Sequence, residues 1–545
     1  MNALVPLPVL LPLLAAGSEL VLGTRYPRAQ RIVGVVVLTA VLGLSLTLLV
    51  AADSRGPLVM HLGDFAPPLG ITLVADRLSA LMLTVSAAVT LCVLVYSVSQ
   101  GMADREEQSP LAVFHPAYMV LVAGVSCTFL AGDLVNLYVG FEIMLVASFV
   151  LLTLGGTAAR LRAGATYVLV SLVSSMVFFT AVALTYAAAG TVNLAQLAVR
   201  LAELPIGVRT LLEATLLTVF AVKAAVFPLA AWLPDSYPTT PAPVTAVFAG
   251  LLTKVGVYCV LRTETLLFPG NRLGDLLLVA ALASLVVGVL GAVAQTDLKR
   301  VLSFVLISHI GYMIFGIGIG TRAGLGGAIV YVVHHITVQT ALFLVAGLIE
   351  RRTGTTELTR VGGLAAAVPA LGALFLLPAL NLAGIPPMSG FIGKLELLRA
   401  GVADAGVLAY VLVGAASLTS LLTLYVMAKV WNLAFWRAAP AGAAERGTVL
   451  EEPDTDDSGP DPDADDVVRR PAPAGQAVTA TLSGRAITVT TTTDRLPRTM
   501  TWATAALVLL SLAYTVLGDP FTAVTGRAAD ELLERSPYIE AVLGQ

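Results

Sequence analysis

The sequence contains few charged residues. Only 12% of its 545 residues are charged, against about 25% in a typical soluble domain, whereas 57% are hydrophobic and the mean hydropathy is +0.88. This shortage excludes an ordinary soluble enzyme and predicts an all-α protein that crosses a membrane many times. The formal net charge of −3 gives no reason to expect a nucleic-acid partner.

Cysteine is also scarce. Cys92, Cys127 and Cys259 lie in apolar stretches, and no CxxC motif or Cys/His cluster accompanies them. We interpret all three as packing residues and expect no metal site, no cofactor and no redox step in this chain. The segment MNALVPLPVLLPLLAAGSELVLG lacks the basic start and the cleavage site of a signal peptide, so we expect it to be the first membrane span.

Long apolar runs dominate the rest of the chain. A span needs about 20 mostly apolar residues. Fourteen stretches meet this requirement: 4–22, 31–52, 75–98, 112–131, 133–154, 163–188, 209–231, 243–262, 274–294, 301–319, 324–349, 366–395, 406–434 and 500–517. Arginine and lysine are concentrated in the loops after the odd-numbered spans. The positive-inside rule therefore predicts that these loops are cytoplasmic and that both termini lie on the extracytoplasmic side of the cell membrane.

The spans suggest a division into five parts. We expect N-terminal helices in 1–111, a first five-helix repeat in 112–262, a second in 274–434, a cytoplasmic loop in 435–499, and a last helix with a tail in 500–545. The loop is rich in Asp, Pro and Gly, which predicts disorder over 440–476. Within it, TATLSGRAITVTTTTD alternates in a way that is typical of a short hairpin.

Ionisable side chains interrupt several spans. They are Glu142, Lys223, Lys254, His334, His335 and Lys394, of which Lys394 lies nearest to a span end. Each ionised group at mid-bilayer depth costs at least ~2.5–3.5 kcal/mol. The cost is offset if the groups face one another and water, which is the arrangement of an ion path.

Prolines mark breaks in two of these spans. Pro228 follows Lys223 by five residues, and Pro386 and Pro387 precede Lys394 in GIPPMSGFIGK. Proline removes a backbone hydrogen bond, so helices seven and twelve should be broken near their lysines. Paired broken helices in two halves of a transporter indicate inverted repeats and an ion path between them.

Several motifs resemble one known family. AAWLPDSYPTTPAPVTAVFAGLLTKVGVY, AQTDLKRVLSFVLISHIGYM, LNLAGIPPMSGFIGKLEL and GDLVNLYVGFE are similar to the large antiporter-like subunits shared by respiratory complex I and Mrp-type cation/proton antiporters. Within this family, the opening LPVLLPLLAA and the C-terminal YIEAVLG resemble the D-type member of Mrp antiporters. The resemblance implies a membrane subunit that works with other membrane subunits on protons and monovalent cations.

The resemblance also implies roles for individual residues. Proton translocation would involve Glu142, Lys223, Lys254, His335 and Lys394. The family often has a lysine one helical turn after the span-eleven histidine, but here that position is Gln339, which cannot carry a proton.

Gln339 is a secondary candidate, because an amide can hydrogen-bond and help hold a water chain. Two further residues are also secondary candidates. His334 is either a packed, hydrogen-bonded histidine or a second relay. Asp133 at a short outer turn is either a site that admits cations or a helix N-cap.

The chemistry of a proton switch follows from elementary electrostatics. Burial favours the neutral amine of a lysine, whereas a carboxylate at ~4 Å favours the ammonium by roughly 4 kcal/mol at an effective dielectric constant of 20. A change in the distance between Glu142 and Lys223 would therefore bind or release a proton. Histidine, which titrates near neutral pH, suits an intermediate relay.

Three functions remain open. The chain is a proton-translocating subunit of a multi-subunit Na⁺(Li⁺/K⁺)/H⁺ antiporter, a pumping subunit of complex I or a membrane hydrogenase, or a structural membrane subunit. The buried ionisable residues argue against the third. Neighbouring genes for several small membrane proteins would favour the first, and genes for quinone- and NADH-handling subunits the second.

Overall fold

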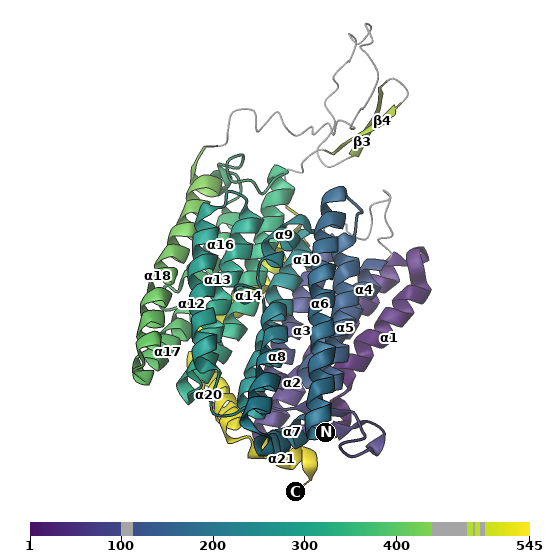
Figure 1. Cartoon of the computed structure of the whole chain (residues 1–545). Coiled ribbons are helices and arrows are strands. Elements are labelled where there is room, and N and C mark those ends of the chain that lie inside the picture. The colour runs from purple at the N-terminus through teal and green to yellow at the C-terminus, as the bar shows by residue number, and fades with distance from the viewer. Residues whose placement is uncertain (100–112, 439–476, 483–484, 491–495, 545) are drawn as a thin grey trace.

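The computed structural model describes residues 1–99, 113–438, 477–482, 485–490 and 496–544. Helices run side by side through most of the molecule, and both termini lie at the same end of the bundle (Figure 1). This arrangement suits a membrane, because a helix satisfies its own backbone hydrogen bonds in a solvent that offers none.

The chain begins with helices α1 to α6. Their bounds are α1 (Leu7–Leu22), α2 (Pro27–Arg55), α3 (Arg77–Ser99), α4 (Phe114–Leu130), α5 (Leu134–Thr153) and α6 (Ala158–Ala189). The next helices, up to the middle of the chain, are α7 (Leu194–Arg200), α8 (Ile206–Ala224), α9 (Trp232–Ser236), α10 (Ala242–Val247) and α11 (Thr253–Arg262). Two π-helical turns, Phe248–Leu252 and Thr263–Leu267, flank α11.

The second half has the same helical character. Its helices are α12 (Gly274–Ala294), α13 (Leu298–Ile319), α14 (Arg322–Thr353), α15 (Leu364–Ala367), α16 (Pro369–Ala383), α17 (Ser389–Asp404) and α18 (Val407–Val430). The C-terminal part contains α19 (Arg498–Val516), α20 (Gly518–Glu534) and α21 (Ser536–Leu543).

All fourteen stretches that we expected to span the membrane lie largely on helix. Among the described residues, eleven helices are long and apolar enough to cross a bilayer on their own. The exceptions are α4 and α16, which are apolar but shorter, and α8, which carries three charged residues. The chain is thus a multi-pass helical membrane protein, while the count of fourteen crossings stays a prediction.

Burial separates central from peripheral helices. The most apolar windows of α14 and of the Ala242–Leu267 segment are completely buried, whereas only 28% of that of α2 is. The central helices carry Lys254 and both adjacent histidines, His334 and His335. Polar groups therefore occupy the interior of the bundle, and the lipid-facing surface stays apolar.

Some elements were not predicted. Strand β1 (Leu58–His61) pairs antiparallel with β2 (Thr72–Ala75), with Leu58 opposite Ala75. The amphipathic helices α20 and α21 cross the end of the bundle where both termini lie (Figure 1). They are too polar to be recognised as spans.

Ion pairs attach α20 to the bundle. Arg527 contacts Asp53 on α2, and Glu531 contacts Arg77 on α3. Arg322, at the start of α14, pairs with Asp530 and holds the pKa of that carboxyl below its usual range. Helix α20 therefore joins the N-terminal helices to the second half of the chain.

The predicted hairpin in the 435–499 loop is confirmed. Strand β3 (Ala477–Leu482) pairs antiparallel with β4 (Arg485–Thr490), with Ala477 opposite Thr490. The alternation of Thr and Val with smaller residues was a sufficient signal for it. The stretch expected to be disordered, 440–476, lies outside the described residues.

Candidate functional site

The first broken helix is interrupted where Pro228 predicted. Helix α8 ends at Ala224, Ala225 takes a left-handed conformation with φ of 57°, and the chain becomes helical again at Trp232. Ser284 of α12 accepts a hydrogen bond at 3.0 Å from the Phe227 amide. A backbone group freed by the break is thus satisfied by a neighbouring helix, as the bilayer interior requires.

Lys223 lies one residue before that break and is loosely held. Its ammonium donates to the Ser171 carbonyl at 3.4 Å and to the Ser175 hydroxyl at 3.3 Å, both long distances for a charged donor. It also lies 5.6 Å from the centre of the Phe141 ring. Lys223 also lines a small open pocket of about 30 Å³, which has room for a water molecule or two. Lys223 therefore has room to change partners.

Glu142 lies near Lys223 but does not bind it. The two residues interact electrostatically, yet no ion pair within 4.0 Å joins them among the residues the structure describes. One carboxyl oxygen of Glu142 is buried without a hydrogen bond. The predicted ion pair between Glu142 and Lys223 is therefore not formed in this structure.

Lys254 occupies the centre of the bundle and is completely buried. Its ammonium donates to the Ala249 carbonyl at 2.7 Å. This carbonyl is available because Phe248–Leu252 form a π-helical turn, which shifts the backbone hydrogen bonds by one residue. Gly256, half a turn further along, lies so close to α8 that a Cβ atom there would be 2.5 Å from the Ala224 nitrogen. The segments that carry Lys223 and Lys254 are therefore in direct contact.

A histidine cluster follows Lys254. The rings of His335 on α14 and His309 on α13 lie 5.2 Å apart. Neither ring nitrogen of His335 has a hydrogen-bond partner among the described residues. His309 contacts the Tyr331 hydroxyl through Nδ1 at 2.8 Å. His309 was not among the residues expected from the sequence, although an ionisable residue in the apolar run VLISHIGYM was the signal for it.

The three secondary candidates have identifiable partners. His334 contacts the Ser389 hydroxyl through Nδ1 at 3.0 Å, at the start of α17. Gln339 donates from Nε2 to the Leu302 carbonyl at 2.8 Å, while its side-chain oxygen is buried without a partner. Asp133 caps α5 by accepting from the Asn136 amide at 2.6 Å. This last contact fits the helix-cap interpretation of Asp133.

The second broken helix contains Pro386 and Pro387. Helix α16 ends at Ala383, Gly384 is left-handed with φ of 85°, and α17 begins at Ser389. The side-chain oxygen of Asn381 accepts from the Gly390 amide at 2.9 Å, so α16 and α17 are linked across the break.

Lys394 binds this second break directly. Its ammonium donates to the carbonyls of Leu382 and Ala383, both at 3.0 Å, and to the Ser420 hydroxyl at 2.8 Å. It also lies 5.0 Å from the centre of the Tyr312 ring. Since the side chain is 4% exposed, it does not reach out to the membrane surface.

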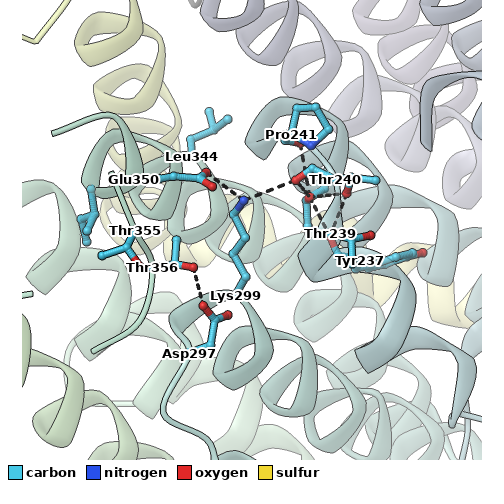
Figure 2. A network of polar contacts seen from close by, with 12 residues as sticks. Tyr237, Thr239, Thr240, Pro241, Asp297, Lys299, Leu344, Glu350, Thr355 and Thr356 are labelled. Atoms are coloured by element: carbon cyan, nitrogen blue, oxygen red, sulfur yellow. Dashed lines mark hydrogen bonds and ion pairs between the residues drawn. The ribbon is translucent and has the colours of Figure 1, made fainter. Parts of the chain in front are cut away.

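A separate network lies at the opposite end of α14 from α20. Asp297 caps α13 by accepting from the Arg300 amide at 3.0 Å, and it contacts Thr356. Lys299, however, is buried and reaches between Glu350, at 2.8 Å, and the Thr240 carbonyl, at 3.3 Å (Figure 2). It thereby fixes the linker between α9 and α10.

These contacts place the predicted lysines and His335, together with His309, in a row across the bundle. We call this row of ionisable residues the file. Lys223 and Lys254 lie on contacting segments, His335 and His309 come next, and Lys394 lies over Tyr312. No unbroken chain of hydrogen bonds joins them among the residues described. In the part of the chain that the structure describes, no group of three or more His, Cys, Asp or Glu residues could hold a metal ion.

Known proteins resemble this chain in sequence and in fold. A family described as "NADH:quinone oxidoreductase/Mrp antiporter, TM" matches residues 131–423. The D-type Na(+)/H(+) antiporter protein of Alkalihalophilus pseudofirmus is 42% identical over 440 residues, covering 80% of this chain and 87% of the relative. A chain in the structure of the Mrp complex from Dietzia sp. DQ12-45-1b is 31% identical, with a TM-score of 0.85 and coverage of 100% and 99%.

The same fold occurs in a more distant protein. A chain of respiratory complex I from Thermus thermophilus is 24% identical, with a TM-score of 0.76 and coverage of 99% and 100%. At that identity the likeness concerns the fold alone.

Proposed function

The chain belongs to the NADH:quinone oxidoreductase/Mrp antiporter family, and on that premise we propose that it is the D-type, proton-translocating subunit of a multi-subunit Na⁺/H⁺ antiporter. The observation that carries the proposal is the file of buried ionisable groups from α8 to α17. Buried amines and imidazoles are expensive in a membrane and are otherwise hard to explain.

Each group has a distinct role in the proposal. Lys223 gains or loses its proton as Glu142 approaches or retreats. Lys254 takes that proton at the centre, and His335 passes it on. Lys394 is the terminal group at the second break. No hydrogen bond joins one of these groups to the next in the described structure, so in the proposal water completes the path.

Partners and orientation complete the proposal. In the described structure no group of three or more His, Cys, Asp or Glu residues could hold a metal ion, and the proposal places the crossing of the cation in contact with another membrane subunit. The chain is a transporter subunit without an enzymatic reaction of its own.

In the proposed orientation both termini lie on the extracytoplasmic side of the cell membrane. A fusion of alkaline phosphatase to the C-terminus tests this orientation, because the enzyme is active only on that side. An inactive fusion would contradict it.

The central test replaces Lys254 by methionine in the complete antiporter complex. Methionine fills a similar space without a titratable group. We expect Na⁺-driven proton movement in vesicles to fall by about a hundredfold, the contribution of one positioned proton-transfer group. Lys429→Met is the matched control, since Lys429 binds the carbonyls of Val293 and Gln295 away from the file. Near-normal exchange in an assembled Lys254→Met complex would overturn the proposal.

The respiratory alternative is weaker. It rests on a shared fold at 24% identity, whereas the antiporter relative is 42% identical over most of both chains.

A further inference from the structure

Two buried carboxyl groups lie outside the file. Glu213 on α8 is 0% exposed, and Glu264 in the π-helical turn Thr263–Leu267 is 6% exposed. None of their four oxygens accepts a hydrogen bond from a described side chain, although the backbone amide of Leu273 lies close enough to Glu213 to favour its carboxylate. Buried carboxyl groups are almost always hydrogen-bonded, so these two groups, like Glu19 on α1, require an explanation.

The helix packing brings the two carboxyl groups together. Helices α8 and α11 are antiparallel and touch at Ala224 and Gly256. Eight residues beyond Gly256, about 12 Å along the axis, Glu264 reaches the level of Leu216. Glu213 lies one helical turn from Leu216. The two carboxyl groups also interact electrostatically.

Their depth in the membrane is informative. Glu213 precedes Lys223 by ten residues, which is about 15 Å of helix, or half the thickness of a hydrocarbon core of ~30 Å. The direction is towards α7, α20 and α21, at the lower end of the bundle in Figure 1. This is the side predicted to face outward. The two carboxyl groups therefore lie between the central lysines and the external solution.

Three arginines lie near this pair of carboxyl groups, and two of them, Arg209 and Arg272, act electrostatically on Glu213. Arg209 donates to the Pro269 carbonyl at 3.1 Å, Arg535 to the Leu266 carbonyl at 3.1 Å, and Arg272 to the Thr210 hydroxyl at 3.4 Å. No ion pair within 4.0 Å joins any of them to Glu213 or Glu264 in the described structure. Nearby guanidinium groups favour one negative charge in the site, but two adjacent buried carboxylates repel each other.

The balance of charge identifies the ligand. A sodium ion needs more oxygen ligands than two carboxyl groups supply, and the arginines repel it. A proton needs only one carboxyl oxygen and removes the repulsion between the pair. We propose that Glu213 and Glu264 share one exchangeable proton and form the external proton-loading site that supplies Lys223 and Lys254. This inference rests on the proposed function for its direction of flow.

The first test uses the unaltered complex. Dicyclohexylcarbodiimide reacts with protonated carboxyl groups in apolar surroundings. We expect mass spectrometry to find the adduct on Glu213 or Glu264, with less labelling at higher external pH. Exposed Glu203, at the same end of the bundle, is the internal control and should stay unlabelled. Absence of label on both buried residues would overturn the inference, even if the complex transports normally.

The second test uses Glu264→Gln and Glu213→Gln in the complete complex. We expect exchange to fall by about tenfold or more, with a changed dependence on external pH and an unchanged half-saturating Na⁺ concentration. Glu203→Gln should behave like the unaltered complex. Glu264→Asp keeps a carboxyl group and should recover part of the rate if the Gln variant assembles poorly.

The outcomes separate this inference from the proposed function. Normal exchange in assembled Gln variants, or a changed Na⁺ dependence with an unchanged pH profile, would refute the loading site alone. Labelling of the pair in a complex that exchanges no Na⁺ would refute the proposed antiport function while leaving the shared proton in place.

Discussion

The two broken helices use the same interruption in different ways. In the first, Lys223 lies at the end of α8, beside an open pocket, and its two hydrogen bonds measure 3.3 and 3.4 Å. In the second, Lys394 lies on α17 and binds the last carbonyls of α16, with contacts of 2.8 to 3.0 Å. One lysine lies beside a break, and the other holds a break together.

The different contacts of Lys223 and Lys394 suit different roles. Lys223 has space and weak partners, which suits a group that changes its charge partner during each cycle. Lys394 satisfies buried carbonyls that would otherwise have lost their donors, so it also contributes to folding. The two lysines should therefore respond differently to the same substitution.

The largest expected effect distinguishes them. Lys394→Ala removes three hydrogen bonds and leaves the Leu382 carbonyl without a donor, so the second half should lose about 2–3 kcal/mol of stability. Lys223→Ala removes only long contacts beside a pocket and should cost less than about 1 kcal/mol. Both variants should lose proton transport. Thermal unfolding of the purified complexes measures the difference, and equal melting temperatures would contradict it.

Glu142 tests the first half alone. Glu142→Gln removes the charge that we propose controls Lys223, without removing a hydrogen bond seen in the structure, so exchange should fall about a hundredfold at unchanged stability. Glu142→Asp, which keeps the charge on a shorter side chain, should retain part of the activity. Normal exchange in an assembled Glu142→Gln complex would refute the switch.

The positions of the two helix breaks could be predicted from the sequence, but the different contacts of Lys223 and Lys394 could not. Pro228 and Pro386–Pro387 predicted where the two helices are interrupted, because proline acts on its own backbone. The partners of Lys394 could not be predicted, since Leu382 and Ala383 offer backbone carbonyls that any residue has. Lys394 is also nearer to a span end in the sequence than its full burial suggests.

Other features depended on contacts between distant segments. Glu213 and Glu264 are 51 residues apart in the chain. They interact electrostatically only because α8 and α11 pack at Gly256. Helix α20 is amphipathic and too polar to be recognised by hydropathy. By contrast, Glu142, Lys223 and Lys254 were recognisable as candidates because a charge in an apolar run is conspicuous at the level of sequence.

The connection between the halves is tested at His309. His309→Phe keeps a ring in the cluster but removes the contact with the Tyr331 hydroxyl. We expect exchange to fall about tenfold, less than the 10²–10⁴ of a sole acid–base group, because His335 and water remain. His309→Gln, which retains a hydrogen-bonding group, is the companion variant and should be less impaired. Equal rates for the Phe variant and the unaltered complex would place His309 outside the path.

The smallest expected effect concerns Gln339, between the central and terminal lysines. Its one hydrogen bond goes to the Leu302 carbonyl, within α13, and its side-chain oxygen is buried without a partner. Gln339→Leu removes both the bond and the unsatisfied oxygen at similar volume. Loss of the hydrogen bond is destabilising, whereas removal of the unsatisfied oxygen is stabilising. The free energy of unfolding should therefore change by less than about 1 kcal/mol. Exchange should change less than about twofold, because an amide carries no proton. Vesicle assays on equal amounts of assembled complex measure this. A collapse of exchange in Gln339→Leu would instead show that the amide orders the water between the two halves, so that the second half depends on a polar residue at this position as much as on Lys394.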